Sequence, residues 1–297
     1  MVDEKISGNL IQSFSKINLY LEIKKKLSNG YHEIESLSVF TDIHDNLTFR
    51  SSNNISLVVN GDEKNKLGDT HENIIIKAAK LIQEILKIDK GIAITLDKRI
   101  PVAAGLGGGS SNAAVTIQEC VKLWKPKEKI KIDSNEIAYK LGADIPFFLK
   151  GSSALVGGIG EKVYPLNFFP KLYSIIVNPK LHISTNIIYS SFKGPFITNP
   201  SKFSNVKQTT NEDLFAYLNR RKNCLTNIVI QKEPIVRDVL DLLCQTHGAE
   251  LVRMSGSGPT CFALYSNRQD MDIAYNFIYN KRPNWWIKKS QIRLKVS

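Results

Sequence analysis

The sequence predicts an α+β protein with about two domains. Its 297 residues are enough to bury a substantial hydrophobic core, and 42% of them are hydrophobic. Segments with two-residue apolar alternation, typical of strands, are interspersed with segments whose apolar residues recur every three or four positions, typical of helices. One strand and one helix are joined by a glycine-rich loop at residues 105–109, and we expect the chain to be organised around this junction.

The first strand carries two candidate functional residues. Residues 13–24 alternate apolar side chains with Lys16, Asn18, Tyr20 and Glu22, which predicts a half-buried strand. Lys16 and Asn18 are two residues apart and therefore share one face. Asn is depleted in strands, so its position beside Lys16 is notable, although a pair of ordinary surface residues also explains it.

A turn, further short strands and a helix follow. The turn is at residues 28–30, strands are expected at 31–40, 46–50 and 55–59, and a helix at 71–87. Thr70 is expected to cap that helix. His32, beside the turn, is by itself more typical of a plain surface residue than of a ligand-binding residue.

The glycine-rich loop has the features of a phosphate-binding site. A strand at 91–97 leads into P-V-A-A-G-L-G-G-G-S-S-N-A-A, residues 101–114, and a helix is expected over 112–124. Glycine lets the backbone approach a ligand, Ser110 and Ser111 suit the N-cap, and the first N–H groups of a helix attract anions. A glycine turn without a ligand remains possible. The Walker A motif is excluded because no Lys follows the glycines in sequence, and Ser110 interrupts the dinucleotide-binding pattern.

Asp144 lies where a short helix over 134–141 should end, because Pro146 disfavours helical geometry at the preceding residue. Two interpretations have equal weight. Asp144 caps the helix that follows it, or its carboxylate is held at the opening of the phosphate site.

The C-terminal half alternates strands and helices. Strands are expected at 152–156, 172–177, 251–254, 260–265 and 287–296. Helices are expected at 234–246 and 270–279, and Ser184 or Thr185 can cap a further short helix. A glycine turn is expected at 157–160 and a long surface loop at 193–213. A third glycine loop, residues 255–260, is best explained by its pattern as a tight hairpin. A lysine-rich connector around Pro126 joins the second and third helices.

Composition limits the class of protein. The net charge of +12 comes from 40 Lys and Arg against 28 Asp and Glu, spread along the chain. Such scatter indicates a solvated basic surface or attraction of a nucleotide more than a nucleic-acid-binding face. The four cysteines form no C-x-x-C pair, and neither a signal peptide nor a membrane span is visible. We therefore expect a cytoplasmic protein without membrane partners.

Three segments in this order resemble the signatures of the GHMP kinase superfamily: the early strand with Lys16 and Asn18, the loop P-V-A-A-G-L-G-G-G-S-S and the late loop M-S-G-S-G-P-T. Four motifs resemble one branch of it more specifically: S-K-I-N-L-Y-L, N-G-Y-H-E-I-E-S-L, G-L-G-G-G-S-S-N-A-A and L-G-A-D-I-P-F-F-L. The resemblance extends from about residue 13 to residue 265. It implies a GHMP kinase fold, with an N-terminal ribosomal protein S5 domain 2-like domain at 1–168 and a ferredoxin-like domain at 169–297. The active site would lie in the cleft between them.

The most similar branch of this superfamily phosphorylates a cytidine-diphosphate-linked methylerythritol with ATP and Mg²⁺. The resemblance implies that Asp144 accepts the hydroxyl proton and that Lys16 stabilises the attacking oxygen. It places the ATP phosphates against Pro101, Val102, Ala103, Ala104, Gly105, Leu106, Gly107, Gly108, Gly109, Ser110 and Ser111, and the substrate against Asn18, Tyr31, His32 and Tyr189. Residues 102–104 depart from the family, where glycine is frequent.

Several points are left open by the sequence. No carboxylate pair indicates a metal site, so Ser110 or Ser111 is only a candidate Mg²⁺ ligand. We expect a monomer or weak homodimer. The alternatives are a GHMP kinase acting on another small alcohol and, in a different class, a nucleic-acid-binding protein with Trp285 and Trp286 among basic residues.

Overall fold

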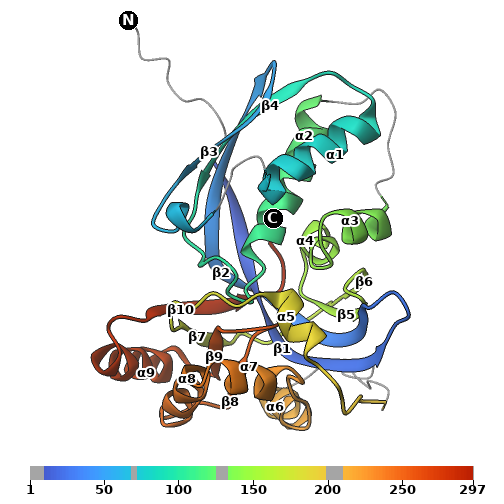
Figure 1. Cartoon of the computed structure of the whole chain (residues 1–297). Helices are drawn as coiled ribbons and strands as arrows, with labels where there is room; N and C mark the ends of the chain where they lie inside the picture. The colour runs from blue at the N-terminus through green and yellow to red at the C-terminus, as the bar shows by residue number, and fades with distance from the viewer. Residues whose placement is uncertain (1–9, 68–71, 125–132, 199–209, 297) are drawn as a thin grey trace, which may run out of the picture.

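Helices and strands alternate in two adjoining parts of the molecule, shown in Figure 1. The computed structural model describes residues 10–67, 72–124, 133–198 and 210–296, and every structural statement below concerns these residues. The strands within them form one continuous sheet of ten strands. No helix in these ranges is long and apolar enough to cross a membrane.

The upper part in Figure 1 contains the glycine-rich loop. It contains β3 (Ile55–Asn60), β4 (Gly91–Asp97) and part of the long strands β1 (Ile11–Lys26) and β2 (His32–Ser52). β1 and β2 continue into the lower part, where Ile23 and Ile34 join its hydrophobic core. β2 pairs antiparallel with β1 and β4, while β3 and β4 are parallel. Helices α1 (Ile74–Leu86) and α2 (Gly108–Trp124) bury Ile82, Ala113 and Ile117 in one hydrophobic core with the strands.

The core of the lower part has a β-α-β-β-α-β order, with shorter helices inserted after its first strand. Its strands are β7 (Tyr173–Asn178), β8 (Leu251–Met254), β9 (Cys261–Tyr265) and β10 (Trp286–Arg293). They run in the spatial order β10-β7-β9-β8, which is the antiparallel arrangement of a ferredoxin-like sheet. Helices α8 (Ile235–Cys244) and α9 (Arg268–Lys281) pack against this sheet. β10 also pairs with β2, where Ile292 lies opposite Thr41, so the two parts share a sheet.

The remaining elements are shorter. They are η1 (Lys64–Lys66), α3 (Ser134–Lys140), α4 (Ile145–Lys150), β5 (Ala154–Gly158), β6 (Lys162–Pro165), α5 (Thr185–Ser190), α6 (Asn211–Asn219) and α7 (Thr226–Lys232). The sequence did not predict β6, α6 or α7. α6 begins inside the segment expected to be a surface loop, and much of that segment, like the connector around Pro126, lies outside the described residues.

The prediction that β1 is half-buried was wrong. Lys16, Asn18 and Glu22, expected on a solvated face, are each less than 5% exposed. Different segments cover this face: a Cβ built on Gly107 of the glycine-rich loop would lie 3.2 Å from Lys16 Cε, whereas the Glu22 carboxylate binds Arg221 at 3.0 Å. The strands predicted at 31–40 and 46–50 are likewise one strand, since β2 continues through both and pairs along its length with β1.

Two predicted helix starts are corrected. α1 begins at Ile74 with Asn73 as its N-cap, and the expected cap, Thr70, lies outside the described residues. α2 begins at Gly108, four residues earlier than predicted, so Ser110 and Ser111 lie in its first turn and do not cap it. The helix therefore starts within the glycine-rich loop, and its free N–H groups belong to loop residues.

Candidate active site

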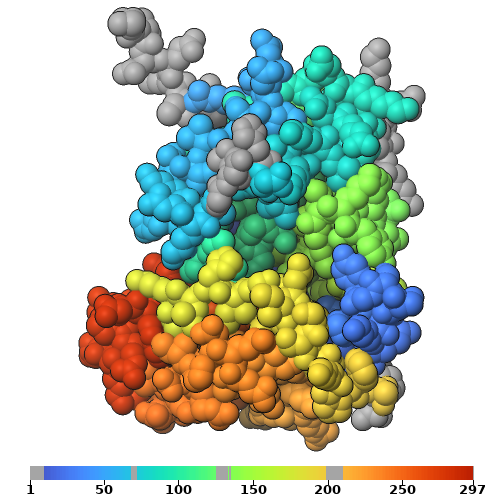
Figure 2. All heavy atoms as spheres, viewed as in Figure 1, coloured from blue at the N-terminus to red at the C-terminus, as the bar shows by residue number. Residues whose placement is uncertain are grey.

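A cavity of about 790 Å³ lies where the two parts meet. Figure 2 shows the surface hollowed between the yellow segment that contains α5 and the teal-to-green segments above it. The glycine-rich loop forms one wall, and β1, the turn before β2, α5 and the β8–β9 connection contribute to the others. A cavity of this size suits a small molecule with several polar groups.

The glycine-rich loop takes backbone conformations that require glycine at two positions. Gly105 and Gly107 have φ of 73° and 69°. A Cβ on Gly105 would collide with the Ser255 carbonyl oxygen, and one on Gly107 would lie 2.6 Å from the Phe148 ring. Ala103 has φ of 50°, a conformation that glycine adopts more readily, at one of the positions where the family often has glycine. The loop is thereby folded tightly against its surroundings and directs the start of α2 toward the cavity.

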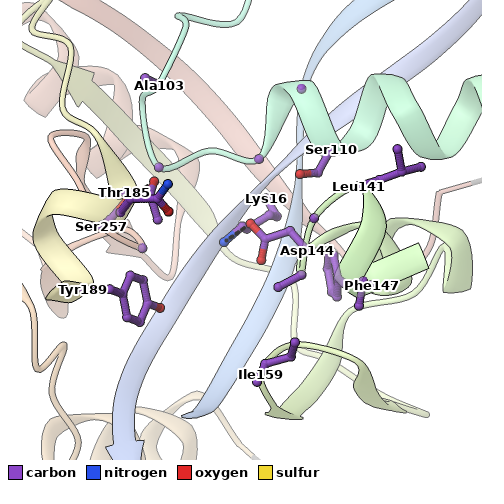
Figure 3. A pocket seen from close by; sticks show the side chains of 18 of the residues that line it. Lys16, Ala103, Ser110, Leu141, Asp144, Phe147, Ile159, Thr185, Tyr189 and Ser257 are labelled. Atoms are coloured by element: carbon purple, nitrogen blue, oxygen red, sulfur yellow. Dashed lines mark hydrogen bonds and ion pairs between the residues drawn. The ribbon is translucent and has the colours of Figure 1, made fainter. Parts of the chain in front are cut away.

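Lys16 and Asp144 meet in this cavity although 128 positions separate them in the sequence numbering. Lys16 Nζ lies 3.3 Å from Asp144 Oδ2, the lysine side chain being 5% and the carboxylate 45% exposed. Figure 3 shows the two side chains pointing toward each other, with Ser110 on the helix start to one side and Tyr189 to the other. The pair is therefore open to a ligand from the side of the carboxylate.

The capping interpretation of Asp144 is only partly correct. Asp144 occupies the N-cap position of α4, but its side chain makes no capping hydrogen bond. By contrast, Asp133 caps α3 by accepting from the Asn135 N–H at 2.8 Å. The Asp144 carboxylate is thus committed to Lys16 and the cavity.

Asn18 orients Lys16. Its Oδ1 accepts from Lys16 Nζ at 2.5 Å, while its Nδ2 donates to the hydroxyls of Ser36 at 2.8 Å and Ser38 at 3.1 Å. The Asn18 N–H donates to Ser255 Oγ, which itself donates to the Gly105 carbonyl. The third glycine loop is a hairpin connection, as its pattern favoured, and it also binds the glycine-rich loop and lines the cavity through Gly256 and Ser257.

Aromatic side chains line the opposite end of the cavity. His32 is 5% exposed, and its Nε2 has no hydrogen-bond partner among the described residues. Burial, followed by the charge of Lys26, lowers the pKa of His32, which favours the neutral ring. The Tyr189 ring lies 5.8 Å from it, and burial together with the charge of Asp144 raises the pKa of the Tyr189 phenol. Tyr31 is exposed at the rim against Tyr139, with their ring centroids 5.9 Å apart.

The structure brings together most of the predicted site residues. Those that line the cavity are Lys16, Asn18, Tyr31, His32, Pro101, Val102, Ala103, Ala104, Gly105, Gly107, Gly108, Gly109, Ser110, Asp144 and Tyr189. Leu106 and Ser111 do not line it. Leu106 is 1% exposed in the core, and the Ser111 hydroxyl is buried and accepts from Ser13 at 2.7 Å.

The sequence did not predict that Lys98, Tyr139, Thr185 and Asn186 would also line the cavity. No Lys follows the glycines in sequence, yet two lysines approach them in space. A Cβ added to Gly107 would lie 3.2 Å from Lys16 Cε, and one added to Gly108 would lie 3.3 Å from Lys98 Nζ. For Lys98 the available signal was its position just before Pro101, at the end of β4.

The cavity fits a triphosphate better than it fits a resident metal ion. No group of three or more His, Cys, Asp or Glu that could hold a metal occurs in the described ranges. Asp144 is the one carboxylate among the cavity-lining residues, and the Ser110 hydroxyl at the helix start is a further oxygen donor. Mg²⁺ commonly binds through one or two protein oxygens plus phosphates and waters, so these residues fit an ion carried by the triphosphate.

Comparisons with known proteins agree with this geometry. The family model for the GHMP kinases N terminal domain matches residues 73–152, and the model for GHMP kinases C terminal matches residues 204–284. The chain is 36% identical over 290 residues to the 4-diphosphocytidyl-2-C-methyl-D-erythritol kinase of Paramagnetospirillum magneticum, covering 95% of this chain and 98% of the relative. It is 34% identical to the enzyme of that name from Rhodopseudomonas palustris, covering 93% and 95%.

Solved structures are similar over nearly the whole chain. A crystal structure of 4-(cytidine 5'-diphospho)-2C-methyl-D-erythritol kinase has a TM-score of 0.74 and 27% identity, and the match covers 96% of this chain and 99% of that one. A homoserine kinase from Cytophaga hutchinsonii, at 17% identity and a TM-score of 0.67, shares the fold. These matches confirm the predicted GHMP kinase fold, and with it an ATP-dependent small-molecule kinase. The chain belongs to the GHMP kinase family and, within it, to the 4-diphosphocytidyl-2-C-methyl-D-erythritol kinases.

Proposed function

We propose that the protein transfers the γ-phosphoryl group of ATP to the 2-hydroxyl of 4-diphosphocytidyl-2-C-methyl-D-erythritol, a step of non-mevalonate isoprenoid precursor biosynthesis. The observation that carries this proposal is the 3.3 Å approach of Lys16 Nζ to Asp144 Oδ2 beside the start of α2. The substrate follows from the names of the relatives, whose full lengths this chain nearly matches.

The residues of this chain supply alignment and charge stabilisation, which phosphoryl transfer mainly requires. The Asp144 carboxylate accepts the proton of the attacking hydroxyl. Lys16, held by Asn18, places its ammonium group where negative charge develops on that oxygen. The N–H groups at the start of α2 and the backbone of the glycine-rich loop receive the phosphates of ATP, from Pro101 to Ser110.

Mg²⁺ is part of the proposal and would neutralise charge on the ATP phosphates. Ser110 is the hydroxyl that we expect to contact it, because Ser111 is engaged by Ser13. The ion would otherwise be held by the phosphates themselves, and Asp144 is the one carboxylate among the cavity-lining residues.

His32 and Tyr189 are proposed to bind the cytosine base. The neutral His32 ring has one donor and one acceptor nitrogen, and its buried Nε2 lacks a partner among the described residues, as expected of a group that a polar ligand edge satisfies. Tyr189 lies beside it and offers a ring face for stacking. Tyr31 would contact the substrate at the rim.

A substrate panel tests this proposal. Purified protein with ATP and Mg²⁺ should phosphorylate the 2-hydroxyl of the cytidylated substrate, measured as ADP release and identified by mass spectrometry and ³¹P NMR of the product. We expect kcat/KM to fall by about 10³-fold or more for methylerythritol 4-phosphate without the cytidine group, because the unpaired polar groups around His32 then oppose binding. Equal activity on both would instead favour a GHMP kinase for another small alcohol.

Gly107→Ala should reduce kcat/KM for ATP by about 10²-fold, because a displacement of about 1 Å in a reacting group has that effect. The added methyl group meets the Phe148 ring at 2.6 Å and Lys16 Cε at 3.2 Å, at a φ of 69°. Gly157→Ala, in β5 and outside the cavity lining, is the matched control, since its methyl group would make an ordinary 3.8 Å contact with the Ile34 carbonyl oxygen. Equal kinetics for the two variants would show that the loop tolerates the displacement.

The cellular setting is also part of the proposal. All four cysteines are free thiols, as a reducing compartment favours, and we propose a cytoplasmic location. We further propose that the protein is a monomer or weak homodimer and has no nucleic-acid partner. Within each chain, we propose a boundary between the two domains near residue 168. Size-exclusion chromatography with light scattering would measure the mass directly.

A further inference from the structure

A carboxylate that is fully buried lies beneath the glycine-rich loop. Asp45, on β2, is 0% exposed and receives four hydrogen bonds. Its Oδ1 accepts from the N–H groups of Arg99 at 2.7 Å and Ile100 at 2.8 Å. Its Oδ2 accepts from Lys98 Nζ at 2.6 Å and Asn112 Nδ2 at 3.0 Å. Every lone-pair direction of this carboxylate is therefore engaged.

Lys98 completes the arrangement. Its side chain is 3% exposed, and its ammonium donates to the Ile100 carbonyl at 2.6 Å as well as to Asp45. The Lys98 N–H donates to the Asn60 carbonyl at the end of β3. Burial lowers the pKa of Lys98 while the neighbouring Asp45 raises it, so the charged pair depends on both partners being present.

These contacts join the two ends of the glycine-rich loop. Arg99 and Ile100 immediately precede Pro101, where the loop begins, and Asn112 lies in α2, where the loop has ended. One carboxylate thus binds the backbone before the loop and a side chain after it. Glu63 adds a weaker contact to the loop, accepting from the Val102 N–H at 3.4 Å.

A buried ion pair is a costly way to stabilise a fold, because desolvation offsets much of the attraction. Directional hydrogen bonds, however, fix backbone positions more closely than apolar packing does. Asp45 cannot contact a ligand, whereas the loop whose ends it binds lines the cavity. The effect of Asp45 on catalysis would therefore be exerted through the loop geometry.

The geometry points to Asp45, paired with Lys98, as a positioning residue that holds the glycine-rich loop in its phosphate-binding conformation. This role rests on the proposed binding of ATP by the loop. We expect the pair to affect the binding of ATP and not the binding of the alcohol substrate. No described hydrogen bond or ion pair joins Asp45 or Lys98 to the residues proposed for catalysis and substrate binding, which are Lys16, Asn18, His32 and Tyr189.

The test is a split between two Michaelis constants. In Asp45→Asn the amide N–H group must face either the Lys98 and Asn112 donors or the two backbone N–H donors, so the side chain can no longer bind both ends of the loop. We expect KM for ATP to rise about tenfold or more, while KM for the alcohol substrate at saturating ATP changes less than about threefold. Isothermal titration with a non-hydrolysable ATP analogue should show the same loss. The double variant Asp45→Asn/Lys98→Met removes both charges and should recover part of the ATP affinity.

Two further variants make the result decisive. Glu22→Gln removes another buried carboxylate, which lies 3.0 Å from Arg221 Nη1 and makes no described hydrogen bond to the glycine-rich loop. This variant should leave KM for ATP unchanged. If Asp45→Asn does not fold, Asn112→Ala is the substitute test. It removes only one of the four donors to Asp45 and should raise KM for ATP by a smaller factor.

Unchanged KM for ATP in the folded Asp45 or Asn112 variant, or an equal loss for both substrates, would overturn the positioning role. Absence of turnover by the wild-type protein would instead contradict the proposed function. The two failures are therefore distinguishable.

Discussion

Asp144→Asn should reduce kcat by about 10³-fold or more while leaving ATP binding within about threefold of wild type, since general-base catalysis contributes 10²–10⁴-fold and the Lys16 pair is lost with it. The amide is nearly isosteric but cannot accept the hydroxyl proton. Single-turnover phosphorylation measures the chemical step, and titration with a non-hydrolysable ATP analogue measures binding.

The control for this variant comes from the neighbouring helix. Asp133 makes the capping bond that Asp144 does not make, so Asp133→Ala should lower the free energy of unfolding by about 1 kcal/mol with little effect on kcat. Asp144→Asn should show the reverse pattern. A loss of stability with normal turnover in Asp144→Asn would mean that its position at the start of α4 is its main role.

Lys16→Met should reduce kcat by about 10²- to 10³-fold, the range for loss of one group that stabilises transition-state charge. Met retains the apolar length of the side chain, so the packing of Cε against Gly107 is largely kept. What is removed is the ammonium between Asn18 and Asp144. Stopped-flow or quenched-flow measurement of product formation would determine kcat, and thermal unfolding would confirm the fold.

Two companions of this variant separate charge from geometry. Lys16→Arg keeps the charge but should not restore activity, because a planar guanidinium cannot take the position of the ammonium between Asn18 Oδ1 and Asp144 Oδ2. Lys25→Met, on the same strand, removes an exposed ion pair to Glu33 and should behave as wild type. Full activity in Lys16→Arg would show that only a positive charge is needed.

Much of the fold was predictable because its strands and helices carry their own periodicity. The strand at residues 91–97 was predicted with the bounds that β4 has, and the helix at 134–141 differs from α3 by one residue. The burial of β1 was not predictable, since alternation along one strand does not reveal that Gly107 and Arg221, both distant in the sequence, pack over its polar residues. Long-range packing is not a local property of the sequence.

The candidate site was likewise only partly predictable from the sequence. Local chemistry identified the glycine-rich loop, and the family motifs identified Lys16 and Asp144, which the structure brings together. Lys98 was missed because its neighbours in space, Asp45 and Gly108, come from other elements. Asp144 was ambiguous for the opposite reason: its backbone does occupy an N-cap position, and only the direction of its side chain separates the two interpretations.

The path of β1 limits how the cleft can change width. This single strand contributes Phe14 to the upper hydrophobic core, Leu19 to the core between the parts and Ile23 to the lower core. A hinge rotation of one part against the other would have to bend β1 or break its hydrogen bonds to β2, because both parts pack on this strand. Ligands must therefore enter and leave through movements of side chains and short segments at the rim, such as Tyr31 and Tyr139, rather than through opening of the whole molecule.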